Sequence, residues 1–180
     1  VLSGMIASEG FAQAQAQKPV QKQAQAANLY TPFMLSLVSP LQVPSEDYSV
    51  GGLRLNILYG MCNDFDGLDI GVVGCATGHA NGLQVGGVNL VDGEGLGFQI
   101  NALTGYVKGS YEGIQVGTAN FAWEMNGLQV GLLFNASKSV EGAQIGLINV
   151  TDDMIGVQIG LINVIKKNDT KFIPIFNCSF

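Results

Sequence analysis

From Gly52 onward the chain repeats one short phrase eight times: a glycine, an apolar residue, a polar residue that is usually Gln, another apolar residue and, in most copies, a second glycine. The copies read GLRLN, GLDIG, GLQVG, GFQIN, GIQVG, GLQVG, GAQIG and GVQIG, and they start 14 to 16 residues apart. A repeat of this length is one supersecondary unit, which buries its surface only against its neighbours. The repeat therefore constrains the architecture of the chain far more than its chemistry.

Each repeat shows the alternation that is typical of a β-strand. Apolar residues such as Leu128 and Val130 fall on one face of the strand, and Gln129 falls on the other. The segments between the strands hold turn-forming and charged residues, so we expect turns at 64–66, 138–141, 151–153 and 166–171. One repeat is then one strand of about nine to eleven residues followed by one turn.

Charged residues are almost absent from the predicted strands. Between Gly52 and Ile165 the strand segments hold only Arg54 and Asp69, and nearly every other charge lies in a turn. A soluble β-protein usually places charges on its solvent face, so a sheet whose two faces lack them is covered on both sides or does not face bulk water. The pattern indicates a membrane or an extensive assembly.

Two further strand-like segments, 30–43 and 172–180, bring the expected number of strands to ten. An even number lets an antiparallel meander close, and the terminal Phe180 resembles the C-terminal signal of bacterial outer-membrane barrels. We therefore predict an all-β fold, a ten-stranded antiparallel meander closed into an outer-membrane-type β-barrel over residues 30–180. Its lumen has no wide pore, because it is filled by polar candidates for a binding site: Arg54, Asp69, Gln84, Gln99, Gln115, Gln129, Gln144 and Gln158.

The alternative architecture is a β-solenoid of about 15-residue coils stacked in parallel. In a solenoid the same polar residues form a ladder up one side, joined by the repeated Asn residues. Identical phrasing in every unit favours this arrangement because ladders require it. A solenoid would be a soluble or surface-attached adhesin or assembly module rather than a barrel.

The first 29 residues differ in composition from the repeats. Residues 1–16 have an apolar start and small-x-small sites such as Ala12-Gln13-Ala14, which is typical of the remnant of a secretory signal peptide. Residues 17–29 are rich in Ala and Gln, and we expect a flexible segment there. Both features predict export.

The ordered phrases carry a resemblance to a known group of proteins. VGGLRLNILYG (50–60), GLDIG, the repeated GLQVG and GLINV, and the closing PIFNCSF (174–180) together resemble bacterial cell-envelope proteins with repeated GLQxGLxN-type phrases, whose function is unassigned. The resemblance implies an exported, Gly-rich β-protein. With the predicted barrel, we expect it in the bacterial outer membrane, with the periplasm or cell surface as the alternative. It supplies no catalytic or binding residues.

Candidates for chemistry are scarce, and we predict no enzyme, no catalytic residues, no metal site and no cofactor. His79 is the single histidine, and Cys62, Cys75 and Cys178 lack the CxxC spacing of a zinc site. Cys62 and Cys75 either pair or, as we favour, act as small buried residues. The net charge of −6 disfavours nucleic acid. The partners we expect are membrane lipid, other envelope proteins or further copies of the chain.

Overall fold

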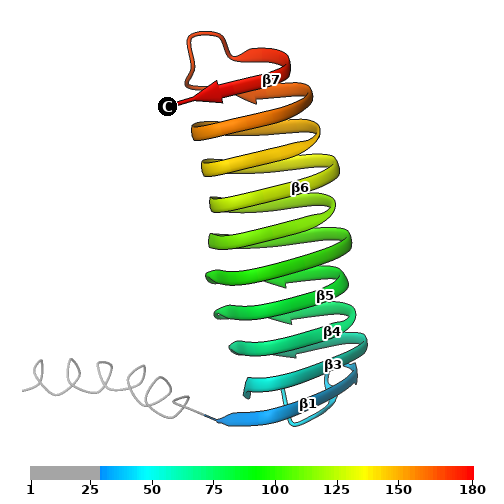
Figure 1. Cartoon of the computed structure of the whole chain (residues 1–180). Coiled ribbons are helices and arrows are strands. Elements are labelled where there is room, and N and C mark those ends of the chain that lie inside the picture. The colour runs from blue at the N-terminus through cyan, green and yellow to red at the C-terminus, as the bar shows by residue number, and fades with distance from the viewer. Residues whose placement is uncertain (1–28) are drawn as a thin grey trace, which may run out of the picture.

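The computed structural model describes residues 29–180 and shows a β-solenoid, one column of stacked coils (Figure 1). The expectations for residues 1–28 lie outside the described part of the chain. One seven-stranded sheet winds through the column in the order β2-β1-β3-β4-β5-β6-β7. The strands are β1 (Tyr30–Val38), β2 (Leu41–Val43), β3 (Ser49–Cys62), β4 (Phe65–Ala76), β5 (Ala80–Val91), β6 (Gly95–Ile165) and β7 (Phe172–Ser179).

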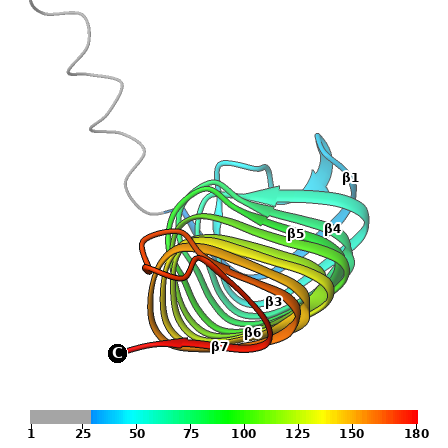
Figure 2. The same cartoon turned by 90° about the horizontal axis from the view of Figure 1, so that it is seen from above.

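Successive repeats lie directly on top of one another in parallel. Gly52 pairs with Gly67, Gly67 with Gly82, and Gly82 with Gly97, and the residues around each glycine keep the same register. Strand β6 contains the remaining repeats as one continuous winding segment of 71 residues. Seen along the column, the coils superimpose around a closed cross-section (Figure 2). This is the solenoid alternative, and the predicted ten-stranded antiparallel barrel is wrong.

The barrel prediction failed at the turns. Residues 138–141 and 151–153 lie inside β6 and carry the chain around a coil, so they do not reverse its direction as hairpin turns would. Segment 166–171 does form a turn, and β7 after it pairs antiparallel with the last repeat. Segment 30–43 is two strands rather than one, with β1 parallel to β3 and β2 antiparallel to β1.

The first glycine of each repeat is required by close contact between coils. All eight of these glycines have a positive φ, as Gly127 does with 133°. A Cβ atom on Gly127 would stand 2.1 Å from the carbonyl oxygen of Gly113 in the coil below, and Gly156 is tighter still at 1.9 Å from Gly142. Glycine alone tolerates both the backbone conformation and the contact. The conspicuous glycine of the phrase is therefore a stacking device.

The interior of the column has a polar side and an apolar side. The ladder residues, from Arg54 to Gln158, are at most 3% exposed and fill one side together with buried Asn residues. The other side holds the apolar core, which includes Phe65, Val91, Met125 and Ile165. The apolar residues that alternate with the Gln residues point outward. The sequence pattern is thus inverted relative to an ordinary sheet, with amides inside and aliphatic side chains outside.

Both ends of the column carry a strand that differs from the repeats. At the N-terminal end the Gln42 side chain of β2 bonds to the Met61 carbonyl at 2.7 Å and covers the first coil. At the C-terminal end β7 covers the last coil. Pro32 in β1 and Pro174 in β7 each remove one backbone N–H from a strand at an end of the column, positions where proline is tolerated better than in central strands. Within residues 29–180 no helix has the length and hydropathy to cross a membrane.

Candidate functional site

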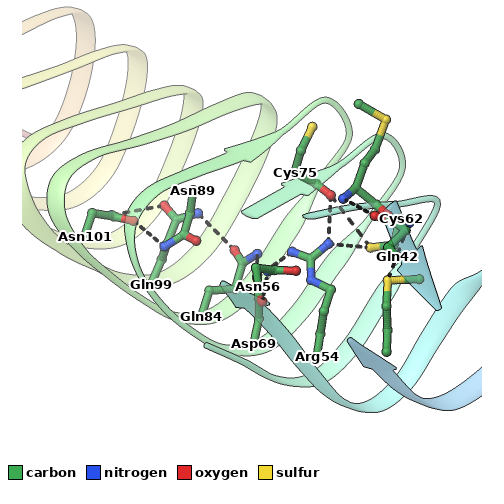
Figure 3. A network of polar contacts seen from close by, with 12 residues as sticks. Gln42, Arg54, Asn56, Cys62, Asp69, Cys75, Gln84, Asn89, Gln99 and Asn101 are labelled. Atoms are coloured by element: carbon green, nitrogen blue, oxygen red, sulfur yellow. Dashed lines mark hydrogen bonds and ion pairs between the residues drawn. The ribbon is translucent and has the colours of Figure 1, made fainter. Parts of the chain in front are cut away.

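The candidate residues form one continuous hydrogen-bonded ladder along the column. Figure 3 shows its N-terminal part, from Arg54 to Gln99. Six consecutive Gln side chains are joined by five amide contacts between 2.8 and 3.0 Å, and in each contact the Nε2 of the later residue donates to the Oε1 of the earlier one. Each coil supplies one Gln because the repeat places it two residues after the stacking glycine. The members are Gln84, Gln99, Gln115, Gln129, Gln144 and Gln158. Their burial supports a structural role, since no ligand reaches them from solvent.

The ladder ends at a buried ion pair in the first two repeats. Arg54 is 0% exposed and Asp69 1% exposed, and the guanidinium donates to Asp69 Oδ2. Asp69 Oδ2 also accepts from Gln84 at 3.4 Å, and Asp69 Oδ1 accepts from Asn56 at 2.6 Å. The two repeats that depart from the Gln pattern thus have their polar residues side by side, where each charge compensates the other.

Arg54 has three further neighbours. Its Nη1 donates to Cys62 Sγ at 2.7 Å and to the Cys75 carbonyl at 2.8 Å, and its guanidinium carbon lies 5.3 Å from the centre of the Phe65 ring. Burial opposes the charge on Arg54, but the charge and hydrogen bond of Asp69 outweigh it, so the pKa of Arg54 lies above its ordinary value. Burial also raises the pKa of the Cys62 thiol to about 12, although Arg54 acts in the opposite direction. The thiol is accordingly neutral and unreactive.

Cys62 and Cys75 lie in adjacent coils but are not bonded. Both are free and buried, and Cys62 pairs in register with Ala76, not with Cys75. A shift of one residue along a strand turns a side chain to the opposite face, so the two sulfur atoms do not face each other.

A second ladder of Asn residues runs beside the first in the opposite sense. Asn120 donates to Asn135 at 3.0 Å, Asn135 to Asn149 at 2.9 Å, and Asn149 to Asn163 at 2.8 Å. These donors point toward the C-terminal end, whereas the Gln donors point toward the N-terminal end. The two rows of amide dipoles therefore oppose each other, which limits the net dipole of the column.

The side chains that most often carry catalysis or bind metals, His, Cys, Asp and Glu, are dispersed in the described part of the chain. The His79 side chain is 60% exposed, and its nearest carboxylate is Glu94 at 4.0 Å. In the described part of the chain no three His, Cys, Asp or Glu residues come together as a group that could hold a metal ion. The site residues that the structure brings together are buried amides and one ion pair, which can stabilise the fold.

The surface has a feature that the sequence reasoning did not identify as a site. The two residues that flank each ladder residue point outward, and all sixteen are Leu, Ile, Val, Phe or Ala. We name this surface the apolar face, and its members are Leu53, Leu55, Leu68, Ile70, Leu83, Val85, Phe98, Ile100, Ile114, Val116, Leu128, Val130, Ala143, Ile145, Val157 and Ile159. Phe98 is 55% and Ile100 45% exposed, so nothing in the described chain covers them. The absence of charged residues from these strands was the sequence signal that could have identified the apolar face as a site.

The charges lie outside the apolar face. Apart from Arg54 and Asp69, every charge between Gly52 and Ile165 falls in the short connections between repeats, which hold nine carboxylates and two lysines. We name these connections the charged edge; they are residues 63–66, 77–81, 92–96, 108–112, 123–126, 138–141 and 152–155. The solenoid is therefore amphipathic along its whole length.

An open groove of about 610 Å³ lies beside the charged edge. Its lining includes the aromatic residues Tyr106, Phe121 and Trp123 together with Ala136. Trp123 is 53% exposed, and the Lys138 ammonium stands 4.4 Å from the centre of its ring. Exposed rings with a neighbouring cation are a surface that can contact another molecule.

Comparisons with known proteins give no relative: no protein-family profile, no curated protein and no solved structure matches the chain.

Proposed function

We propose that the protein is a non-enzymatic β-solenoid of the bacterial cell envelope that works as an assembly module, with the apolar face as its docking surface. The resemblance of the ordered repeat phrases to bacterial envelope proteins supports the location. The interior supports a rigid structural element, because the ladder residues are locked by hydrogen bonds that run the length of the column.

The observation that carries the proposal is the separation of the apolar face from the charged edge. Soluble monomers rarely expose a contiguous apolar patch above a few hundred Å², and larger patches mark sites of interaction. Here sixteen apolar residues in eight stacked rows form one uninterrupted surface with no charged member. Burying this surface against an apolar partner would be favourable by about 25 cal/mol per Å².

Site-specific photo-crosslinking of the full chain in its native cells tests the proposal. A photoreactive residue replaces Ile100 on the apolar face in one variant and the exposed Thr77 on the charged edge in a matched control. We expect a discrete adduct from position 100 and none from position 77. Failure to form an adduct from position 100 and from a second position, 145, would overturn the assembly role.

A second candidate function is that of a surface adhesin, favoured by the groove beside Trp123. The test is binding of the full chain to purified envelope polysaccharides, with Trp123→Ala against Tyr30→Ala, an exposed tyrosine far from the groove. Loss of binding with Trp123→Ala alone would support this function. Equal binding by both variants would remove it.

A further inference from the structure

We infer that the apolar face binds a second copy of this chain, and that the two solenoids form a parallel dimer with two-fold symmetry. This inference rests on the proposed assembly role and names its partner.

The face is large enough for a stable interface. Neighbouring rows in a sheet are about 4.8 Å apart, so eight rows span about 38 Å. Across the strand, the two face residues of a row are followed by a third exposed apolar residue in most repeats, as Leu132 (70% exposed) follows Leu128 and Val130, so four steps of about 3.4 Å give a width of about 14 Å. Two such surfaces in contact would cover roughly 1,000 Å² in total, which is the lower limit for a specific protein interface. Stacked sheets pack about 10 Å apart with side chains interdigitated, and aliphatic faces of this kind suit that packing.

Charges along the border select the parallel orientation. The residue that precedes the first glycine of a repeat borders the face, and it is acidic at Asp66, Glu112 and Glu141. In an antiparallel dimer with all rows overlapping, the same border of both copies would coincide and Asp66 would meet Glu141 of the other copy. In a parallel dimer, two-fold symmetry brings this border against the opposite border, which carries no charge. The parallel arrangement therefore avoids like-charge contacts, which are destabilising across an interface.

The same border argues against a lipid surface as the occupant. Anionic membranes attract segments flanked by Lys and Arg. No basic residue lies on the apolar face. None occupies the position before the first glycine of any repeat, where Asp66, Glu112 and Glu141 stand. Carboxylates at that position would be repelled by anionic headgroups.

The column ends favour a closed dimer over a growing fibre. The strands at the two ends, β2 with β1 and β7, do not carry the repeated phrase, so no repeat is left open at either end for another copy to stack on along the column axis. A two-fold contact through one face uses that face on both copies and leaves none for a third.

Light scattering coupled to size-exclusion chromatography of the full chain tests the inference. We expect a dimer, and we expect Ile100→Glu or Ile145→Glu to raise its dissociation constant by about 100-fold, because each buries a carboxylate among aliphatic side chains. The control Thr77→Glu adds the same charge at an exposed position of the charged edge that does not border the apolar face, and it should leave the dimer intact. Far-UV circular dichroism and urea unfolding establish that each variant is folded.

Disulfide trapping tests the orientation, with Cys178→Ser as the background. In the parallel dimer Leu128 faces Val130 of the other copy, so a mixture of Leu128→Cys and Val130→Cys chains should form a mixed disulfide. An antiparallel dimer would instead link Leu128→Cys to Leu83→Cys. Trapping of that second pair would overturn the parallel orientation.

The inference and the proposed function can fail separately. The inference would be overturned by a wild-type chain that stays monomeric over a 100-fold range of chain concentration. A dimer whose dissociation constant does not respond to Ile100→Glu and Ile145→Glu would overturn it too. If the chain is monomeric yet position 100 forms an adduct in cells, the assembly role stands with a different partner. If the monomer instead binds vesicles of phosphatidylcholine and phosphatidylglycerol, the occupant is lipid and the dimer is wrong.

Discussion

Gln84 donates its side-chain amide to Asp69 at 3.4 Å, and through this contact the ladder of neutral amides joins the buried ion pair. An ionised carboxylate can only accept, so Gln84 presents Nε2 to it and its Oε1 is left to accept from Gln99. Each following Gln is then oriented in the same way, with its Nε2 donating to the Oε1 of the Gln before it. The single anion in the interior fixes the direction of the whole ladder.

The ion pair should be replaceable only as a unit. Asp69→Gln alone leaves Arg54 buried without a counter-ion, and we expect it to lower the free energy of unfolding by about 3–5 kcal/mol. The double variant Arg54→Gln/Asp69→Gln extends the Gln ladder by two rungs and should recover all but about 1–2 kcal/mol. Urea unfolding at one chain concentration measures both. A double variant no more stable than the single one would show that the pair does more than compensate its own charges.

A gap in the middle of the Gln ladder should be costly because it affects three partners. Gln129 donates to Gln115 and accepts from Gln144 and Ser137. Gln129→Leu removes all three contacts and leaves buried polar atoms unpaired, so we expect a loss of about 2–4 kcal/mol in the free energy of unfolding. The neighbouring Asn126→Ala is exposed and should change it by less than about 0.5 kcal/mol. Equal losses in the two variants would mean that the ladder contributes nothing specific.

Much of the fold could be predicted from the sequence, but the direction of stacking could not. Alternation of Leu128, Gln129 and Val130 correctly indicates a strand, and the repeat indicates that neighbouring units stack. Period-two alternation is identical for parallel and antiparallel neighbours, so it did not distinguish coil from hairpin. The stacking contact of Gly127 on Gly113 depends on three-dimensional proximity, which the pattern does not encode.

The position of the interior also escaped sequence reasoning. Aliphatic residues are usually buried and amides usually exposed, whereas here Gln129 is buried and Leu132 is 70% exposed. Alternation also breaks at the corner of each coil. Leu161 and Ile162 are adjacent and both exposed, which returns Asn163 to the interior. The signal that could have revealed the inversion is the repetition of Gln itself, because a solvent-facing position has no need of the same residue in six successive repeats.

The stacking glycines make a sharp steric prediction. Gly127→Ala places a Cβ atom 2.1 Å from a backbone oxygen and demands a φ of 133°, which an L-residue rarely adopts. We expect a loss of about 3 kcal/mol or more in the free energy of unfolding. The matched control is Gly51→Ala, whose Cβ would meet only the Tyr30 ring at 3.2 Å. Thermal unfolding by circular dichroism compares the two, and similar midpoints would contradict the stacking explanation.

The buried Cys62 thiol should make the fold sensitive to alkali. Its pKa is about 12 in the folded chain and 9.0 in the absence of its surroundings. Above pH 9 the unfolded chain therefore loses this proton while the folded chain keeps it, so the free energy of unfolding falls as pH rises toward 12. Burial raises the pKa values of Cys75 and Tyr111 too, and they act in the same direction.

The contribution of Cys62 can be isolated by substitution. Cys62→Ala places in the first coil the residue that Ala76 and Ala122 already supply in later coils, and it removes one titrating group. Urea midpoints measured between pH 8 and about 10.5 should fall for both chains, with the smaller slope in Cys62→Ala, because the fully developed contribution of one proton is about 1.4 kcal/mol per pH unit. Identical slopes would mean that the Cys62 thiol ionises as readily in the folded chain as in the unfolded one. In that case the contact from Arg54 Nη1 to the sulfur would be holding a thiolate, and the interior around Asp69 would carry two anions against a single cation.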